Sequence, residues 1–479
     1  MRWLMFLAMC IATGCSLDHR PRNCSLPSVT SERPPEATSV CSATTATLPV
    51  EISLVKTVTA IIEDAGPYSP QDDVSSYATL EELLFLAFGN NPAINELAAT
   101  TQIAAGYRTQ VGLYANPMVG YQAQQLADAG TDQHLVFIEQ QMITGGKLQL
   151  NRRVLNEAVR AQLQELEAQK LRVATDVKTR FFDCIRFQEQ LTAVEEFSIQ
   201  LQQGVIVAEN RLKAGEASKI DLLQTQVQLK QLELQRKQLE ASLKARLREV
   251  VALAGLPDLQ LLGVIGKLPD FSEATDQNVL EEVLVAMSPE VTAAQARISQ
   301  AAAAVRRHEV QPLPNLAVQL GAGVDNGTGS GMMNVQVGAP IPVFNKNQGN
   351  LVAARAEYCR AVHEAQRIDN AIRARLALAT GDYERAAVAV NVITSELLPM
   401  ARESLDLAEQ AYRAGEQDFI QLLDTRRTYF DTNLALIGAR ADLANAQAQI
   451  DGYLLSGALN SVINGSGDNS LRGLTLDQL

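Results

Sequence analysis

Histidine and methionine side chains are the residues of this sequence that could bind a metal ion or act in catalysis, but their spacing favours neither. The four histidines are His19, His134, His308 and His363. They lie in different segments, and none has a second His at the short spacing of a metal site. Met332 and Met333 could contact a soft metal, yet adjacent methionines at a strand end more often pack or face lipid. With no Ser-His-Asp set and no phosphate-binding loop, the sequence predicts no enzyme, no cofactor and no metal site.

The composition narrows the class of protein further. The 479 residues include 47% hydrophobic and 20% charged residues, which excludes wholesale disorder, and only 5% aromatic residues, which favours long helices over a bulky core. A net charge of −13 argues against non-specific binding to nucleic acid. The length alone suggests roughly three domains of about 150 residues each.

The amino terminus predicts export. Arg2 precedes an apolar stretch, residues 3–13, that is too short to cross a bilayer and typical of a secretory signal. It ends in Ala12-Thr13-Gly14-Cys15, which resembles a bacterial lipobox, so we expect a lipoprotein-type signal peptide over residues 1–15 with Cys15 as the lipid attachment site. The alternative is an ordinary signal peptide in which Gly-Cys occurs by chance.

Residues 16–76 are rich in Ser, Thr and Pro and predict a disordered tether. Cys24 and Cys41 lie inside it and could pair in an oxidising compartment or remain free thiols. Cys184 and Cys359 fall in helical patterns, where we expect small core residues.

The rest of the chain contains an internal repeat, which replaces the three-domain estimate. The run Leu80-Glu81-Glu82-Leu83-Leu84 recurs 200 residues later as residues 280–284, and Asn91-Pro92 corresponds to Ser288-Pro289, each a helix cap followed by proline. Ala214-Gly215-Glu216 recurs, at the same offset, as Ala414-Gly415-Glu416. We therefore expect two repeats, residues 77–262 and 263–457, and a flexible tail, residues 458–479.

Each repeat is predicted to run as a helix, a strand hairpin, a very long helix, a turn and a second long helix. Residues 147–213 would form a helix of about 100 Å at 1.5 Å per residue. Gly215 and Gly415 stand where a left-handed cap would reverse each helix, so the tips are expected at residues 213–221 and 413–424. Ordinary antiparallel helix hairpins would use the same features.

Alternating apolar and polar residues predict four strands, residues 117–125, 133–141, 315–323 and 332–340. Four strands cannot close a barrel alone, so pairing with other copies of the chain is one way to cover their edges. Packing of both hairpins on the helices as a small soluble sheet is the other.

Three further segments give the chain a family resemblance. They are Ala115-Asn116-Pro117, residues 141–147 (QMITGGK) and residues 341–349 (IPVFNKNQG). With the tips, they resemble the TolC-like outer-membrane efflux proteins, most closely the branch that serves cobalt-zinc-cadmium resistance pumps. The resemblance implies a mainly α fold with a small β part, assembled as a homotrimer with a twelve-stranded outer-membrane β-barrel and a periplasmic α-helical barrel. It also implies two partners, a periplasmic adaptor (membrane fusion protein) and an inner-membrane resistance-nodulation-division pump.

The same resemblance assigns roles to residues. Strand–helix junctions are expected at Pro117, Gly145, Gly146, Pro340, Pro342 and Gly349. Contact with the adaptor is expected at Ala214, Gly215, Glu216, Ala414, Gly415 and Glu416.

A periplasmic gate is also implied. Asp221 and Tyr412 resemble a carboxylate–tyrosine hydrogen bond that holds the aperture shut, and Asp424 resembles one member of an acidic constriction ring. Gln421 stands where the best-known pattern has another acidic ring member, and Gln417 where it has an arginine, so the gate is expected to be weaker or wired differently. Asp424 as an ordinary exposed side chain is the alternative.

These observations predict a passive outer-membrane efflux duct that reaches into the periplasm, and Ser16 after the lipid-attachment cysteine favours the same membrane. Residues 345–349 favour divalent heavy-metal cations as the substrate. The alternatives are the same fold serving drug efflux or type I secretion, and a soluble periplasmic coiled-coil scaffold, which would not need the strands.

Overall fold

The computed structural model describes residues 77–126, 130–215, 218–269 and 277–461, all within one unit of the chain, residues 52–479. Several predictions fall outside the described residues. These are the signal peptide, the tether, His19, Cys15, Cys24, Cys41, Glu216 and residues 462–479 of the tail.

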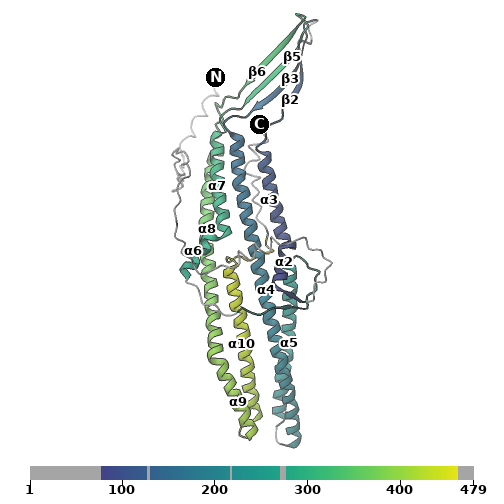
Figure 1. Ribbon diagram of the computed structural model, residues 1–479, viewed down its shortest axis with the longest axis vertical. Coiled ribbons are helices and arrows are strands. Elements are labelled where there is room, and N and C mark those ends of the chain that lie inside the picture. Colours follow the sequence, from purple (N-terminus) through teal and green to yellow (C-terminus); the bar gives the residue numbers. More distant parts are fainter. Residues whose placement is uncertain (1–76, 127–129, 216–217, 270–276, 462–479) are drawn as a thin grey trace, which may run out of the picture. The chain divides into compact units, whose positions relative to one another are not determined.

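The described elements follow the predicted order twice (Figure 1). The first half contains β1 (Tyr77–Thr79), α2 (Leu80–Asn90), α3 (Pro92–Gln110), β2 (Met118–Gln124), β3 (Gln133–Met142), α4 (Lys147–Ala214) and α5 (Lys219–Leu253). The second contains β4 (Gly263–Ile265), α6 (Gln277–Met287), α7 (Pro289–Val310), β5 (Leu316–Asp325), β6 (Ser330–Gly338), α8 (Gln348–Val392), the π-helical turn η1 (Ile393–Leu397), α9 (Leu398–Ala414) and α10 (Phe419–Asp451). The fold is mainly helical with a small β part, as predicted.

Local capping explains where the first helices begin. The Thr79 hydroxyl accepts a hydrogen bond from the Glu82 N–H, and the Glu82 carboxylate accepts one from the Thr79 N–H, so both ends of a capping box are present. Asn91 caps α3 through its Oδ1, and its Nδ2 donates to the Leu253 carbonyl at 2.8 Å, which fixes the start of α3 against the end of α5. Ser288 occupies the matching position before α7 but makes no side-chain cap bond.

Two apolar clusters hold the helices together. We call the bundle of long helices, α4, α5 and α8 to α10, the shaft. One gathers α2, α4, α5 and β4 around Val177 and Phe181, and the other gathers α8, α10 and residues 453–455 around Ile372 and Ile450. Cys184 lies fully buried in the first cluster, and this burial raises the pKa of its thiol to about 12, as fits a core residue rather than a reactive one.

The very long helix of the second half, α8 to α9, differs from the uninterrupted helix that was predicted. It is broken by η1, directly before Pro399 of α9. Proline has no N–H to donate to the carbonyl four residues earlier, and a wider helical turn accommodates that loss. The helix α4, which has isoleucine at the equivalent position, Ile199, runs unbroken for 68 residues.

Two further features were not predicted. The strands β1 and β4 pair in parallel, and the Gln188 side chain of α4 clamps Val264 by bonding both its N–H and its carbonyl. Beyond α10 the chain stays packed: Ala458 is fully buried, and its N–H donates to Asp176 at 2.7 Å. The boundary predicted at residue 458 therefore falls inside the packed region, because α4 supplies polar partners for the chain beyond α10.

The strands β2, β3, β5 and β6 form one antiparallel sheet in that order, which leaves β2 and β6 as its edges. The sheet lies beyond one end of the helices, and the turns α4–α5 and α9–α10 lie at the opposite end (Figure 1). The candidate gate and the sheet are thus separated by the length of the shaft.

Candidate functional site

One face of the four-stranded sheet is apolar and exposed. The strand register aligns Tyr121, Val136, Ala322 and Met333 in one row and Val119, Ile138, Leu320 and Val335 in the next. The large side chains of these rows are between 46% and 82% exposed. A contiguous apolar face of this kind marks a surface that lipid or another protein covers.

The opposite face of the sheet is mostly small and polar. Its residues include Gly120, Gln122, Glu139, Gln319, Gly321, Asn334 and Gln336. The same face also carries Met118, Leu135, Phe137 and Met332, so it is mixed rather than purely polar. One apolar face opposite a face that is richer in polar residues is the pattern of a sheet that separates lipid from water.

The connection from β3 to α4 is held tightly by the chain itself. Lys147 donates from Nζ to the Leu313 carbonyl at 2.6 Å and to Asn315 Oδ1 at 2.9 Å, and burial lowers the pKa of this lysine. Gly145 has a φ of +67°, and a Cβ there would lie 2.6 Å from Val310, so the position requires glycine. Gly146, with a φ of +65°, caps α4.

The remaining predicted junction residues lie at the same end of the helices. Pro117 directly precedes β2, and Gly349 lies in the first turn of α8. Pro340 and Pro342 lie in the connection from β6 to α8, which lines a hollow of about 600 Å³ together with residues 311–315.

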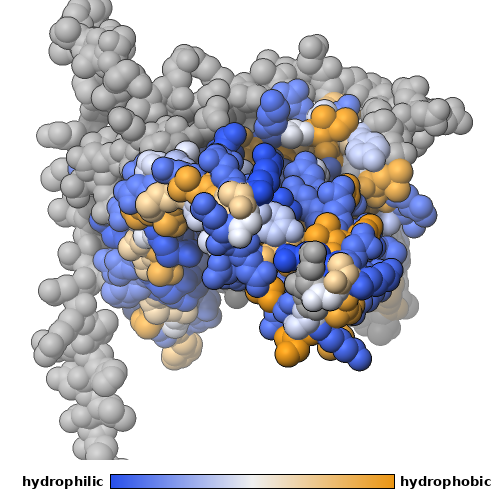
Figure 2. Space-filling model, turned by 90° about the horizontal axis from the view of Figure 1, so that it is seen from below, coloured by the Kyte–Doolittle hydropathy of each residue, from blue (hydrophilic) through white to orange (hydrophobic). Residues whose placement is uncertain are grey.

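At the opposite end, glycine reverses both helix hairpins, as predicted. Gly215 and Gly415 adopt φ values of +75° and +77°, and each N–H closes the last helical turn. Ala214, Ala414 and Glu416 are exposed at these turns. Figure 2 views this end of the molecule and shows apolar and hydrophilic side chains interspersed on it.

Asp221 and Tyr412, which were predicted to form a hydrogen bond at the gate, each contact another residue of the chain. The Asp221 carboxylate accepts a hydrogen bond from the Ser218 N–H at 2.9 Å, which completes the capping box that Ser218 begins at the start of α5. The Tyr412 ring packs 5.8 Å from Phe419 in a small apolar cluster with Ala208 and Leu423. A hydrogen bond between Asp221 and Tyr412 stays a prediction.

The other predicted gate residues lie on the α9–α10 hairpin. Gln417 is half-buried beside α9, whereas Gln421 and Asp424 are exposed on α10. An unpredicted ion pair fastens the same hairpin: Arg426 of α10 lies 2.7 Å from Glu409 of α9. Its sequence signal is slight, because the two residues lie 17 positions apart.

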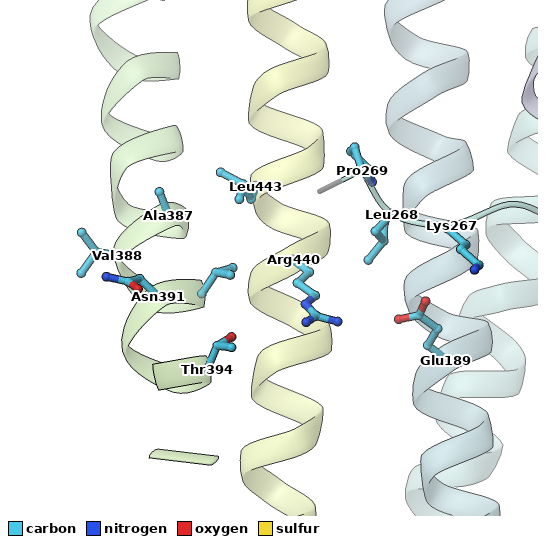
Figure 3. A pocket seen from close by; sticks show the side chains of 11 residues that line it. Glu189, Lys267, Leu268, Pro269, Ala387, Val388, Asn391, Thr394, Arg440 and Leu443 are labelled. Atoms are coloured by element: carbon cyan, nitrogen blue, oxygen red, sulfur yellow. The ribbon is translucent and has the colours of Figure 1, made fainter. Parts of the chain in front are cut away.

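A pocket of about 760 Å³ lies between α4, α8, α10 and the segment 267–269 (Figure 3). Glu189 and Arg440 extend toward one another from α4 and α10, and Thr394 of η1 also lines the pocket. Burial raises the pKa of the Glu189 carboxyl, and Arg440 opposes this rise. The sequence alone does not indicate this pocket, because its lining residues come from four separated segments.

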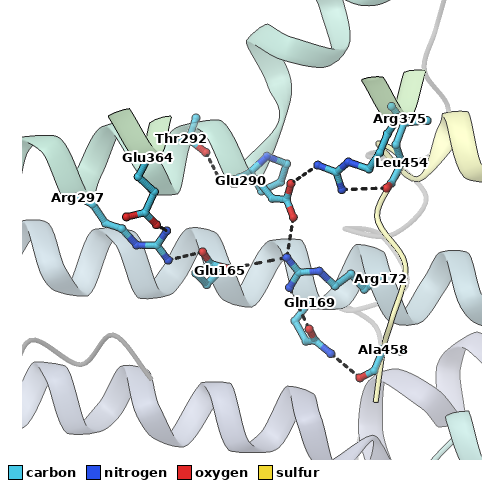
Figure 4. A network of polar contacts seen from close by, with 11 residues as sticks. Glu165, Gln169, Arg172, Glu290, Thr292, Arg297, Glu364, Arg375, Leu454 and Ala458 are labelled. Carbon is cyan, nitrogen blue, oxygen red and sulfur yellow. Dashed lines mark hydrogen bonds and ion pairs between the residues drawn. The ribbon is translucent and has the colours of Figure 1, made fainter. Parts of the chain in front are cut away.

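A chain of partly buried charges fastens α7 and α8 to α4 (Figure 4). Glu290 of α7 lies 2.9 Å from Arg172 of α4 and 2.6 Å from Arg375 of α8, and Arg297 lies 2.5 Å from Glu165. Burial by itself would raise the pKa of Glu290, but Arg375 and Arg172 lower it below the ordinary value of 4.5. The network fixes the helices that carry β5 and β6.

The described residues contain no group of three or more His, Cys, Asp or Glu side chains placed to hold a metal ion. His134 contacts Asp132 and Tyr121 near the sheet turn, His308 lies near Asn347, and His363 lies near Gln366. Among the described helices, none combines the length and the apolar character needed to cross a bilayer.

Comparison with known proteins identifies the family. Residues 280–454, which cover most of the second half, match the family model described as "Outer membrane efflux protein". Residues 280–454 are therefore a domain of the outer membrane efflux protein family. The matched region includes β5, β6, the tip of the α9–α10 hairpin and the connection that carries Pro340 and Pro342.

Relatives and solved structures extend the likeness over most of the chain. The cobalt-zinc-cadmium resistance protein CzcC of Cupriavidus metallidurans is 26% identical over 385 residues, 78% of this chain and 90% of CzcC. The pyoverdine export outer membrane protein OpmQ of Pseudomonas putida is 25% identical over 59% of this chain and 61% of OpmQ. The outer-membrane channel OprN and the channel CusC share the fold, with TM-scores of 0.67 and 0.64 at 17% identity, over 79% of this chain and 90% and 92% of theirs.

Proposed function

We propose that this efflux protein is the outer-membrane duct of a tripartite system, in which an inner-membrane resistance-nodulation-division pump and a periplasmic adaptor deliver substrate. The apolar outer face of the four-stranded sheet carries the proposal, because exposed side chains such as Val119, Val335 and Met333 suit a lipid surface. The duct is passive, since the energy comes from the pump.

Copies of the chain complete the sheet. Among the described residues, no further strand pairs with the edges β2 and β6, and a lipid environment tolerates no such unpaired edge. Three copies would join twelve strands into a closed barrel, as the family resemblance implies. The same ring would continue the long helices into a periplasmic tunnel.

The internal repeat supports side-by-side assembly of the helices. Within the chain, Leu423 of α10 is buried beside Gly204 of α4, where a Cβ would lie 3.7 Å from it. The repeat equivalent of Leu423 is Leu223 of α5, which is 49% exposed. The equivalent of Gly204 is Ser404, which lines a groove of about 510 Å³ on α9. Since the α9 groove is open and Leu223 of α5 is exposed, α5 of one copy would fill the α9 groove of the next and close a ring.

Divalent heavy-metal cations are the proposed substrate. The 26% identity to a cobalt-zinc-cadmium resistance protein supports this choice, and copies of Asp424 converging on one axis would attract cations. The likeness to a pyoverdine export protein makes export of an organic compound the second candidate.

The remaining site assignments are part of the same proposal. Cys15 would carry a lipid anchor, and the exposed tip residues Gly215, Gly415 and Glu416 would contact the adaptor. Asp221, Tyr412, Gln417, Gln421 and Asp424 would line the periplasmic aperture.

Deletion and complementation test the function and the substrate together. Cells that lack the protein should lose tolerance to cobalt, zinc or cadmium, and the wild-type chain should restore it. Asp424→Asn should restore tolerance only in part, whereas Asp431→Asn, a matched exposed aspartate on the same helix, should restore it fully. Loss of tolerance to organic compounds alone would contradict the metal substrate, and recovery of the protein outside the outer-membrane fraction would contradict the duct.

A further inference from the structure

The connection from β6 to α8, residues 339–347, exposes several large apolar side chains. Ile341, Val343 and Phe344 are 81%, 62% and 92% exposed. We call this segment the junction strap. Its equivalent in the first half, residues 143–146, is shorter and lies against the chain's own residues 310–315 through Thr144 and Gly145.

The junction strap is held in a fixed shape. Asn347 is buried with a φ of +60°, and its Nδ2 donates to the His308 carbonyl at 2.9 Å. The Asn347 N–H donates to Asn345 Oδ1, the Lys346 N–H donates to Gln348 Oε1, and Pro340 and Pro342 restrict the backbone further. The apolar side chains are therefore displayed by an ordered backbone over the hollow that residues 311–315 line.

Sheet topology indicates what would lie beside the strap. The strand β6 is an edge strand that ends at the helices, so the strap lies at the outer boundary of the chain. The strand β2 is the other edge and begins at the same end, directly after residues 111–117. Because strands alternate in direction across the sheet, β6 of one copy would pair antiparallel with β2 of the next, and its strap would then lie beside residues 111–117 of that copy.

Those residues present matching apolar groups. Leu113 and Tyr114 are 49% and 69% exposed, and the turn that carries them is ordered by Arg152, which donates to the Gly112 carbonyl at 3.0 Å. We propose that Leu113 and Tyr114 of one copy pack into the hollow beneath the junction strap of the next, against Ile341, Val343 and Phe344. This inference rests on the proposed assembly of the duct and adds the contact that locks its strand–helix junction.

Cysteine cross-linking in isolated membranes tests the contact. Tyr114→Cys combined with Val343→Cys should give a reducible band at a multiple of the chain mass, which neither single variant gives. The single variants also control for the natural cysteines. Tyr114→Cys combined with Val324→Cys, at the far end of an interior strand, should give no such band.

A second pair separates failure of the contact from failure of the proposed duct. Val119→Cys combined in turn with Val335→Cys and Val337→Cys reports pairing of β2 with β6 of another copy. Cross-linking of this edge pair without the strap pair would overturn the strap contact and leave the duct standing. Failure of the edge pair in both registers would count against the joined sheet itself.

Lipid is the competing environment for the strap. The sequence has a single tryptophan, Trp3, so Phe344→Trp adds a distinct fluorescence probe. If a neighbouring copy covers the strap, lipids brominated along their acyl chains should leave this fluorescence unquenched in vesicles. Strong quenching would show that the strap enters the membrane and would overturn the proposal.

Discussion

The two halves of the chain follow one plan but bury different surfaces. In the second half, Leu423 of α10 packs into the chain and is 3% exposed, whereas its counterpart in the first half, Leu223, is 49% exposed. The long helix of the first half is unbroken, and that of the second is interrupted before Pro399. The duplicated sequence thus gives both halves the same order of helices and strands. Which surface each half buries or exposes depends on the elements that lie beside it.

The helices that enter the shaft show the same divergence. After the paired prolines Pro92 and Pro289, the first half has Ala93 and the second has Glu290. Ala93 is buried without charge, while Glu290 joins arginines from α4 and α8. The first half is therefore fastened by apolar packing and a capping amide, and the second by a partly buried ion network.

Removing the negative charge of Glu290 should have the largest effect on stability. Glu290→Gln should lower the free energy of unfolding by about 3 kcal/mol, because Arg172 and Arg375 lose a shared, partly buried partner. Urea unfolding of the detergent-solubilised chain measures the change. Glu282→Gln, an exposed glutamate on α6, is the matched control and should leave the unfolding free energy unchanged.

Exchanging the residues at the helix break should affect the two halves unequally. Ile199→Pro should cost about 3 kcal/mol, since proline inside α4 removes a helical hydrogen bond that no π-turn accommodates. Pro399→Ala should change stability by less than about 1 kcal/mol, because η1 already absorbs the missing N–H. Equal losses in circular dichroism melts of the two variants would contradict this account.

Truncating the equivalent leucines should separate folding from assembly. Leu423→Ala should lower the unfolding free energy of the chain by about 2–3 kcal/mol through a core cavity. Leu223→Ala should leave it within about 0.5 kcal/mol but lower the temperature at which the oligomer dissociates on gels. An unchanged dissociation temperature would argue that α5 is not covered by another copy.

The smallest expected difference between the halves is in how much stability each loses as the pH falls. The pKa of Glu290 is lowered in the folded chain, so its stabilising contribution is complete above the ordinary value of 4.5 and is lost as the pH falls through the folded pKa. Unfolding measured from pH 6 down to pH 3 should therefore lose less stability in Glu290→Gln than in the wild type. Glu249 of the first half also has a lowered pKa: burial opposes the shift, but Arg246 and Arg180 outweigh it. Glu249→Gln should flatten the same slope less, because Glu249 is more exposed.

Much of the fold was predictable because its signals are local. Period-two alternation located all four strands of the main sheet, and glycine caps located both tips. The break at η1 was missed, although Pro399 is visible, because the helical pattern continues on both sides of it. The strands β1 and β4 were missed because each has three residues and is defined by its partner.

The candidate site was less predictable. The bond expected between Asp221 and Tyr412 stays a prediction, whereas the contacts they make within the chain, a capping-box hydrogen bond for one and a ring contact for the other, were not predicted. Such partners depend on which turn or helix lies within a few ångströms, and single-sequence spacing carries no such distance. The pocket around Glu189 and the pair Glu409–Arg426 escaped notice for the same reason.

The sequence by itself determined the repeat, the long helices, the alternating strands and the glycine turns, because these depend on the backbone preferences and hydrophobic period of neighbouring residues. Only the tertiary structure decided which copy of each repeated leucine is buried and that Glu290 joins Arg172 to Arg375. It also decided that the junction strap presents three apolar side chains to the outside. Those outcomes depend on which elements meet in space, and two halves with nearly the same pattern cannot occupy the same surroundings within one chain.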